Sequence, residues 1–117
     1  MNIAIVGSRN FKDYEFMKSV IETYIEEISL EQIIIVSGGA KGADALAEKF
    51  ASKKGYGTLI FLPEWEKYGR GACSVRNTQI IEKADVVFAF WDGTSRGTKD
   101  STDKAKRMNK KLMVHSY

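Results

Sequence analysis

The chain has 117 residues, of which 44% are hydrophobic and 28% charged, and its formal net charge is +3 at pH 7. This composition suits a single globular domain with one core, and we expect residues 1–117 to form it. Cys73 is the only cysteine, which excludes an internal disulfide and a cysteine-based metal cluster. The mild positive charge suits an anionic ligand but does not by itself indicate nucleic-acid binding.

The first residues, MNIAIVGSR, lack the basic start and the long apolar region of a signal peptide. No apolar stretch reaches the length of about 18 residues that a membrane span requires. We therefore expect a cytoplasmic protein with no membrane partner. With His115 as the single histidine, Ser-His-Asp or Cys-His catalysis is hard to build.

Short apolar runs alternate with helical patterns along the whole chain. These runs are almost continuously apolar, which is typical of strands in a sheet covered by helices on both faces. The expected strands are Ile3–Val6, Ile33–Val36, Thr58–Phe61, Val86–Phe90 and Leu112–Val114.

The helical segments show apolar residues at three- and four-residue steps. The expected helices run from Met17 to Ile28, from Ala43 to a stop at Gly55, from about Arg76 to Lys83, and from about Thr98 to Met108, with Asn109 as a cap. The stretch Leu62–Val75 shows no such pattern and is interpreted as a long loop, a feature that is more often functional than accidental.

Strand–helix alternation implies parallel strands joined by right-handed crossovers. The sequence therefore predicts an α/β, Rossmann-like, doubly wound, mostly parallel five-stranded sheet in the order 3-2-1-4-5, with helices on both faces. Ligands of such sheets bind at the carboxyl edge, where the strand order reverses. That point should lie beneath Gly7–Arg9 and Asp92–Thr98.

Residues 37–44 read SGGAKGAD and follow the second expected strand. Glycine allows positive φ and close approach of a ligand, and the first N–H groups of the next helix attract anions. The residues expected to bind a phosphate or carboxylate here are Gly38, Gly39, Ala40, Lys41 and Gly42. A tight strand-to-helix turn also needs glycine, so a purely structural role stays open.

The stretch GTSRGT repeats this design after the fourth expected strand. Its candidate ligand contacts are Gly93, Thr94, Ser95, Arg96, Gly97 and Thr98, with Arg96 as a bidentate phosphate clamp. Ser95 or Thr94 could instead simply cap the helix. Arg9 and Arg76 are further candidate clamps, with solvated surface charge as the alternative.

Asp44 and Asp92 stand among these phosphate-type donors. Such a carboxylate can orient a ribose hydroxyl or act as a general base. The structural alternatives are stabilisation of the first helical turn for Asp44 and a turn-forming side chain for Asp92. Trp65 is a candidate for stacking on a base, although aromatic side chains are more commonly buried.

Taken together, these stretches, with PEW at 63–65 and RN at 76–77, resemble the YspA/YpsA-related branch of the SLOG superfamily, whose other members include DprA/Smf and the LOG phosphoribohydrolases. The resemblance implies a Rossmann-like fold that binds nucleotides or nucleotide-derived ligands. The positions that it carries over are Gly7, Ser8, Arg9, Gly38, Gly39, Gly42, Asp44, Arg76, Asn77, Asp92, Gly93, Ser95, Gly97 and Thr98.

The resemblance leaves the activity open. LOG enzymes carry a glutamate in a PGGxGTxxE loop, and here Ser101 takes its place, with the Asp100 carboxylate one position earlier. SGGAKGAD is closer to the glycine motif of DprA, but this short chain lacks the accessory domains of DprA.

Three functions follow as hypotheses. The first is a sensor or sequestering module for a nucleotide or a nucleotide-derived small molecule. The second is a hydrolase that cleaves the base–ribose bond of a nucleoside monophosphate, with Asp44, Asp92 or Asp100 as the catalytic carboxylate. The third is a single-stranded nucleic-acid binder that uses the same loops with Trp65. None requires a metal or another cofactor, and we expect a homo-oligomer, either a dimer or a tetramer.

Overall fold

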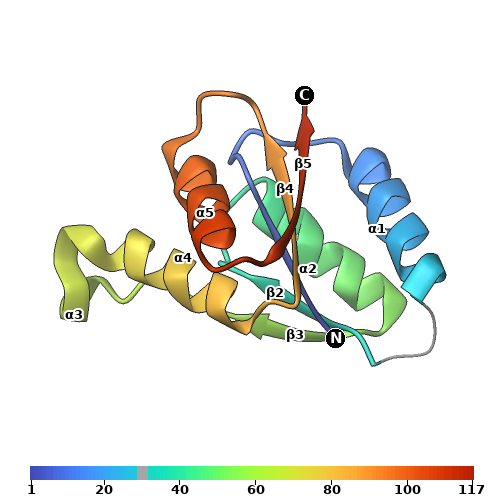
Figure 1. Ribbon diagram of the computed structural model, residues 1–117, viewed down its shortest axis with the longest axis horizontal. Helices are drawn as coiled ribbons and strands as arrows, with labels where there is room; N and C mark the ends of the chain where they lie inside the picture. The colour runs from blue at the N-terminus through green and yellow to red at the C-terminus, as the bar shows by residue number, and fades with distance from the viewer. Residues whose placement is uncertain (29–31) are drawn as a thin grey trace.

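The computed structural model describes residues 1–28 and 32–117. Its parallel sheet has five strands in the order β3-β2-β1-β4-β5, so the predicted fold class and strand order are confirmed (Figure 1). The elements are β1 (Asn2–Gly7), α1 (Tyr14–Ile28), β2 (Ile34–Ser37), α2 (Ala43–Lys54), β3 (Gly57–Ile60), α3 (Trp65–Tyr68), the 3₁₀ turn η1 (Gly69–Gly71), α4 (Ala72–Lys83), β4 (Val86–Trp91), α5 (Arg96–Arg107) and β5 (Lys111–Ser116).

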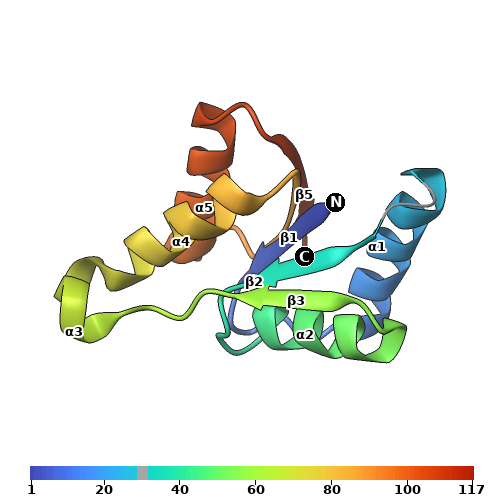
Figure 2. The ribbon, with the colours of Figure 1, turned by 90° about the horizontal axis from the view of Figure 1, so that it is seen from below.

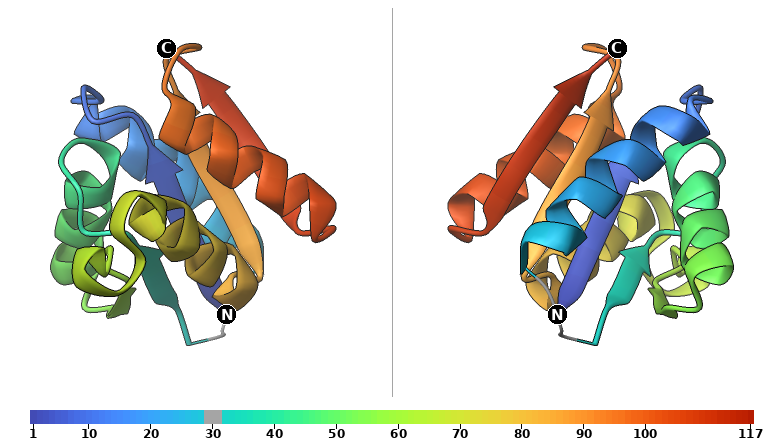
Figure 3. Two further views of the ribbon diagram at one scale, coloured as in Figure 1. Left: turned by 90° about the vertical axis from the view of Figure 1, so that its left-hand side faces the viewer. Right: turned by 90° about the vertical axis from the view of Figure 1, so that its right-hand side faces the viewer.

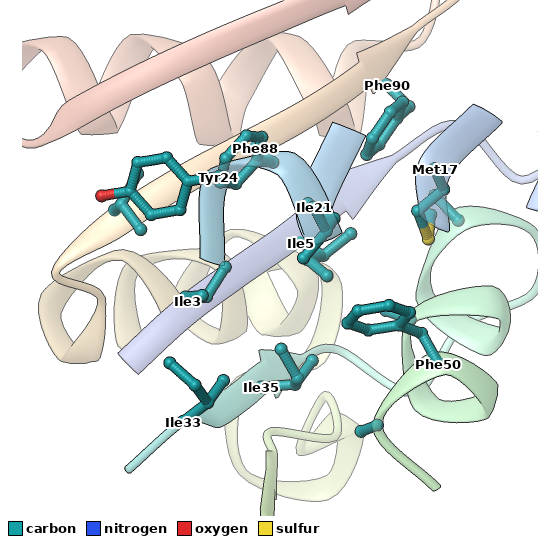
Figure 4. Close-up of a cluster of buried hydrophobic side chains, with 14 of the residues drawn as sticks. Ile3, Ile5, Met17, Ile21, Tyr24, Ile33, Ile35, Phe50, Phe88 and Phe90 are labelled. Carbon is teal, nitrogen blue, oxygen red and sulfur yellow. The ribbon is translucent and has the colours of Figure 1, made fainter. Parts of the chain in front are cut away.

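The two faces of the sheet differ in side-chain size. Ile3, Ile5 and Phe88 pack in the core under α1 and α2, and burying each of these side chains contributes roughly 1.5–3 kcal/mol (Figure 4). Their strand neighbours Ala4 and Ala89 belong to the second cluster, which includes Ile80 of α4 and Ala105 of α5. Figure 3 shows α4 and α5 on the face of the sheet opposite to α1 and α2. The larger side chains therefore supply most of the apolar burial, and the small ones let α4 and α5 approach the sheet closely.

The edge strands are less covered than the sequence pattern predicts. Along β3 only Leu59 is even partly buried, and β5 alternates between exposed and half-buried residues. The expectation of strands buried by helices on both faces therefore holds for β1, β2 and β4 alone within the described ranges. In those same ranges, no helix is long and apolar enough to cross a membrane.

The prediction of a loop over Leu62–Val75 is wrong for much of this range. It contains α3, η1 and the first turn of α4, which begins at Ala72 rather than near Arg76. No residue of α3 or η1 is buried, so these elements have no apolar stripe that periodicity could detect. They form an arm that extends beyond the sheet (Figure 2).

A buried lysine joins α4 to α5. The Lys104 side chain is 8% exposed. Its Nζ donates hydrogen bonds to the Ser74 carbonyl oxygen at 2.6 Å, to Ser74 Oγ at 2.8 Å and to Asp100 Oδ2 at 2.8 Å. Because these partners satisfy the three donors of the ammonium group, the two helices are held together beside the carboxyl edge of the sheet.

Gly42 provides a test of how tightly α2 packs against the loop after β1. Its φ is 74°, and a Cβ atom there would overlap the Ser8 carbonyl oxygen and the Arg9 backbone. Gly55 is a matched control, since its φ is 73° but a Cβ atom there would meet nothing within 4 Å. We expect Gly55→Ala to lower the free energy of unfolding by about 1–2 kcal/mol, and Gly42→Ala to cost about 1–3 kcal/mol more. Urea denaturation measures both; equal losses would contradict the close packing.

Candidate functional site

A pocket of about 450 Å³ lies at the carboxyl edge of the sheet, where the strand order reverses between β1 and β4. The loop after β1, the start of α2, one face of α4 and the loop from β4 into α5 form its wall. Its lining residues are Val6, Gly7, Ser8, Arg9, Asn10, Ala40, Asp44, Cys73, Arg76, Asn77, Ile80, Asp92, Ser95, Gly97, Thr98 and Ser101. The volume falls in the range of about 300–1,000 Å³ that is usual for small-molecule sites.

The structure brings many of the sequence-predicted residues into this wall, but not all of them. Those that line it are Gly7, Ser8, Arg9, Ala40, Asp44, Arg76, Asn77, Asp92, Ser95, Gly97 and Thr98. The predicted residues that lie outside the wall are Gly38, Gly39, Lys41, Gly42, Trp65, Gly93, Thr94, Arg96 and Asp100. Trp65 is 56% exposed on α3, so it is not a buried core aromatic either.

Sequence reasoning missed five wall residues, namely Val6, Asn10, Cys73, Ile80 and Ser101. Cys73 and Ile80 stand three residues before and four after Arg76, on the same face of α4. Helical spacing within the expected helix could have found Ile80, whereas Cys73 could be found only with the helix extended back to Ala72. Ser101 lies one turn beyond Gly97 on α5 and could have been found in the same way.

The Arg76 side chain is buried beneath the loop between β2 and α2. It is 8% exposed, and its Nη1 donates a 2.6 Å hydrogen bond to the Gly38 carbonyl oxygen, while its Nε donates to Asn77 Oδ1 at 2.9 Å. A Cβ atom at Gly38 would lie 2.6 Å from Arg76 Nη1 and 2.9 Å from Asp44 Oδ2. Glycine at position 38 therefore leaves room for the guanidinium and carboxylate groups, rather than for a ligand.

Several N–H groups of this loop already have acceptors inside the protein. The N–H of Gly39 donates to Ser37 Oγ at 3.4 Å and that of Ala40 to Asp44 Oδ2 at 3.2 Å. The N–H of Ala43 donates to the Ser8 carbonyl oxygen at 3.2 Å. The 37–44 loop thus acts chiefly as a tight strand-to-helix turn, and it contributes Ala40 and Asp44 to the pocket wall.

The start of α5 is different, because it retains free donors. Ser95 caps the helix: its Oγ accepts from the Thr98 N–H at 3.4 Å, and its carbonyl oxygen accepts from the Lys99 N–H at 3.2 Å. The N–H groups of Arg96 and Gly97 have no acceptor among the residues that the structure describes. Since Gly97 lines the pocket, its N–H group and the positive end of the helix dipole favour an anion there.

Asp92 shapes the turn that leads into α5. Its Oδ1 accepts hydrogen bonds from the N–H groups of Thr94 and Ser95, both at 2.9 Å. These two bonds lower the pKa of Asp92 to about 2. The Asp92 N–H in turn donates to Ser8 Oγ at 3.3 Å. A carboxylate this acidic is a poor general base near neutral pH.

Asp44 has the opposite electrostatic environment. Its side chain is 7% exposed, and this burial raises its pKa to about 6. The hydrogen bond from the Ala40 N–H and the positive charges of Arg76 and Arg9 oppose this shift without cancelling it. Among the wall carboxylates of the described residues, Asp44 is the better suited to exchange a proton near neutrality.

The remaining polar groups divide into bonded and free ones. Asp100 is bound by Lys104 at 2.8 Å and by Asn77 Nδ2 at 3.1 Å, away from the wall. Ser101 lines the wall and is 2% exposed, yet its hydroxyl has no hydrogen-bond partner within the described part of the chain. Arg9 is an exposed wall residue with neither a hydrogen bond nor an ion pair there. Ser101 and Arg9 are therefore available to a ligand.

A parallel sheet in this strand order, with a polar pocket where the order reverses, is the architecture of the Rossmann-like domains of the SLOG superfamily. The chain belongs to the YspA, cpYpsA-related SLOG family, which matches residues 1–68, more than half of its length. It is also 31% identical over 113 residues to the Gene 61 protein of Mycobacterium phage D29, covering 90% of this chain and 88% of that protein.

Solved structures share the fold over almost the whole chain. DNA processing protein A (DprA) of Streptococcus pneumoniae matches 97% of it with a TM-score of 0.74 and 22% identity. DprA of Helicobacter pylori also matches 97%, with a TM-score of 0.72 and 25% identity. The protein TM1055 matches 95%, with a TM-score of 0.67 and 18% identity. The chain spans 49% of the S. pneumoniae DprA chain, 64% of the H. pylori one and 71% of TM1055.

The opposite environments of Asp44 and Asp92 predict stability profiles of opposite slope. Between about pH 4 and pH 6, folded Asp44 holds a proton that the unfolded chain has released, so the free energy of unfolding falls as the pH rises. Relative to the wild type, the free energy of unfolding of Asp44→Asn should therefore increase by about 2–3 kcal/mol as the pH rises from about 4 to 6. Asp92 stabilises the fold above about pH 4 and loses this effect toward pH 2, so Asp92→Asn should be most destabilising near neutrality.

Urea denaturation at several values between pH 3 and pH 7.5 measures both profiles. Asn at position 44 keeps an oxygen acceptor for the Ala40 N–H, so the variant removes the titration with little change in hydrogen bonding. Profiles that run parallel to the wild type for both variants would contradict the assigned environments.

Proposed function

We propose that the protein binds a nucleotide or a nucleotide-derived phosphorylated ligand in this pocket, as a sensor or sequestering module. The proposal rests mainly on the free Gly97 N–H group at the start of α5, with the unpaired Arg9 guanidinium in the same pocket. N–H groups at a helix start and an arginine together match the geometry and charge of a phosphate group.

The rest of the wall suits the uncharged part of such a ligand. Asp44 can accept hydrogen bonds from ribose hydroxyls, and the Ser101 hydroxyl adds a donor and an acceptor. Val6 and Ile80 belong both to the wall and to the core cluster under α4 and α5, and they supply an apolar floor. A phosphate site next to polar and apolar surface is the pattern expected for a nucleotide.

Binding is better supported than catalysis. Two of the three candidate carboxylates are poorly placed for catalysis, because Asp92 accepts two hydrogen bonds in the turn before α5 and Asp100 is bound by Lys104 and Asn77 outside the pocket wall. Asp44 remains, and its pKa of about 6 is the observation that keeps a hydrolase as the second candidate. The hydrolase would use Asp44 to activate water against the base–ribose bond.

A nucleic-acid ligand shares the same phosphate chemistry. The H. pylori DprA structure is described in terms of a single-stranded DNA binding mode. In this chain α3 exposes Trp65 (56%) and Tyr68 (37%), with the exposed Leu62 (61%) before it and Arg70 in the following turn. Aromatic rings next to cations suit the stacking of unpaired bases, and binding of an oligonucleotide tests this candidate.

Arg9 and Arg96 form a matched pair for testing the phosphate site. Both are exposed cations, but Arg9 lines the pocket and Arg96 does not. With the four ribonucleoside 5′-monophosphates in calorimetric titrations, we expect Arg9→Met to weaken binding by about 10- to 100-fold, since a hydrogen bond to a charged group contributes about 1.5–3 kcal/mol. Arg96→Met should change it by less than about threefold.

Equal effects of the two variants would place the phosphate elsewhere. A short oligothymidylate titrated at rising salt tests the nucleic-acid candidate, whose affinity should fall steeply as salt increases. Absence of binding to every mononucleotide would overturn the proposed function.

Chromatographic detection of free base separates the sensor from the hydrolase. We expect bound monophosphates to remain intact over hours, because the bonded Asp92 and Asp100 leave the catalytic set incomplete. Base release that Asp44→Asn lowers by about 100-fold or more, with affinity largely kept, would favour the hydrolase instead. Asp100→Asn is the control, because Asp100 lies outside the wall.

A further inference from the structure

Cys73 lies in the pocket wall, but the proposed function gives it no role. It is partly exposed and free, in the first turn of α4. Arg76, Asn77 and Ile80 follow it on the same helical face and also line the pocket. Cys73 therefore lies on the side of the pocket that α4 forms.

Ser101 supplies independent evidence for a ligand on this side. Its side chain lines the pocket and is almost fully buried, yet its hydroxyl has no partner among the described residues. Contacts between the helices flank this position: Asn77 Nδ2 lies 3.4 Å from the Gly97 carbonyl oxygen, and Lys104 Nζ lies 2.6 Å from that of Ser74. Cys73 and Ser101 thus border the part of the pocket between α4 and α5, and a hydroxyl that faces the pocket without a protein partner favours an occupant with a polar group.

We propose that Cys73 is a modification site, at which a mixed disulfide with a small anionic thiol of the glutathione class closes the pocket to its ligand. The proposal rests on the proposed function only for the identity of the ligand that is excluded. In the reaction, the Cys73 thiolate attacks one sulfur of the small disulfide and forms the new S–S bond. The other half leaves as a thiolate and takes up a proton.

The pocket has the properties that such an adduct needs. About 450 Å³ of space adjoins the sulfur. The unpaired Arg9 guanidinium and the free Gly97 N–H group attract the carboxylates of the adduct, while the Ser101 hydroxyl can form hydrogen bonds with its amide groups. The same groups that recognise a phosphate would hold the adduct, so the two compete for one space.

The experiment compares the protein with a variant that carries its cysteine elsewhere. Cys73→Ser combined with Ser52→Cys moves the thiol to an exposed position near the end of α2, whereas the wall residue of that helix, Asp44, lies in its first turn. Both proteins are treated with oxidised glutathione, and the adducts are quantified by mass spectrometry. Amide NMR shifts of Gly97 and Ser101 report on the pocket without any nucleotide, and calorimetry with adenosine 5′-monophosphate reports on ligand exclusion.

We expect the Cys73 adduct to shift the Gly97 and Ser101 amides and to weaken binding of the monophosphate by about tenfold or more, with full recovery on reduction. The adduct at position 52 should change neither. Failure of Cys73 to react, or an adduct that leaves these amides and the affinity unchanged, would overturn the proposal. If the unmodified protein binds no monophosphate but the amide shifts occur, the proposed function fails while the modification site stands.

Discussion

The architecture of the pocket depends on one buried cation. Arg76 extends from α4 under the loop between β2 and α2 and binds the Gly38 carbonyl oxygen, so that three elements meet at one guanidinium group. A buried guanidinium is costly unless its donors are bonded. Here the carbonyl oxygen and Asn77 bond it, and the nearby Asp44 carboxylate adds favourable charge. The guanidinium and the Asp44 carboxylate together explain why position 38 has no room for a side chain.

Strand order was predictable from the sequence because it depends on features that a linear pattern records. Apolar runs separated by helical periods imply right-handed crossovers, and few topologies then remain. The start of α4 was not predictable in this way. Its first turn follows an arm in which neither α3 nor η1 buries a residue, so no apolar stripe marks where the helix begins. That single error also hid Cys73, which stands on the pocket face of α4 only once the helix starts at Ala72.

The chemistry of the site was predictable by residue type but not by role. Glycines, hydroxyls and arginines behind two strands indicated an anion site, and both loops do reach the pocket. Which N–H groups are free is a property of three-dimensional contacts. The Ala40 and Ala43 N–H groups have acceptors within the protein, whereas those of Arg96 and Gly97 have none among the described residues. The two glycine-rich loops therefore differ in role. Residues 37–44 mainly form a turn, whereas residues 93–98 keep backbone N–H groups that are free to bind a ligand.

The carboxylates show the same dependence on surroundings. Asp44 and Asp92 carry identical groups in one wall, yet burial raises one pKa to about 6 and two backbone N–H groups lower the other to about 2. An anionic ligand placed beside both would meet one permanent charge, which two N–H groups stabilise, and one charge that a single proton can remove. In the proposed function, protonation of Asp44 lets the pocket take up a phosphate without adding its charge to two ionised carboxylates. Proton uptake by Asp44 therefore fits ligand binding as well as bond cleavage, and its raised pKa alone is no argument for catalysis.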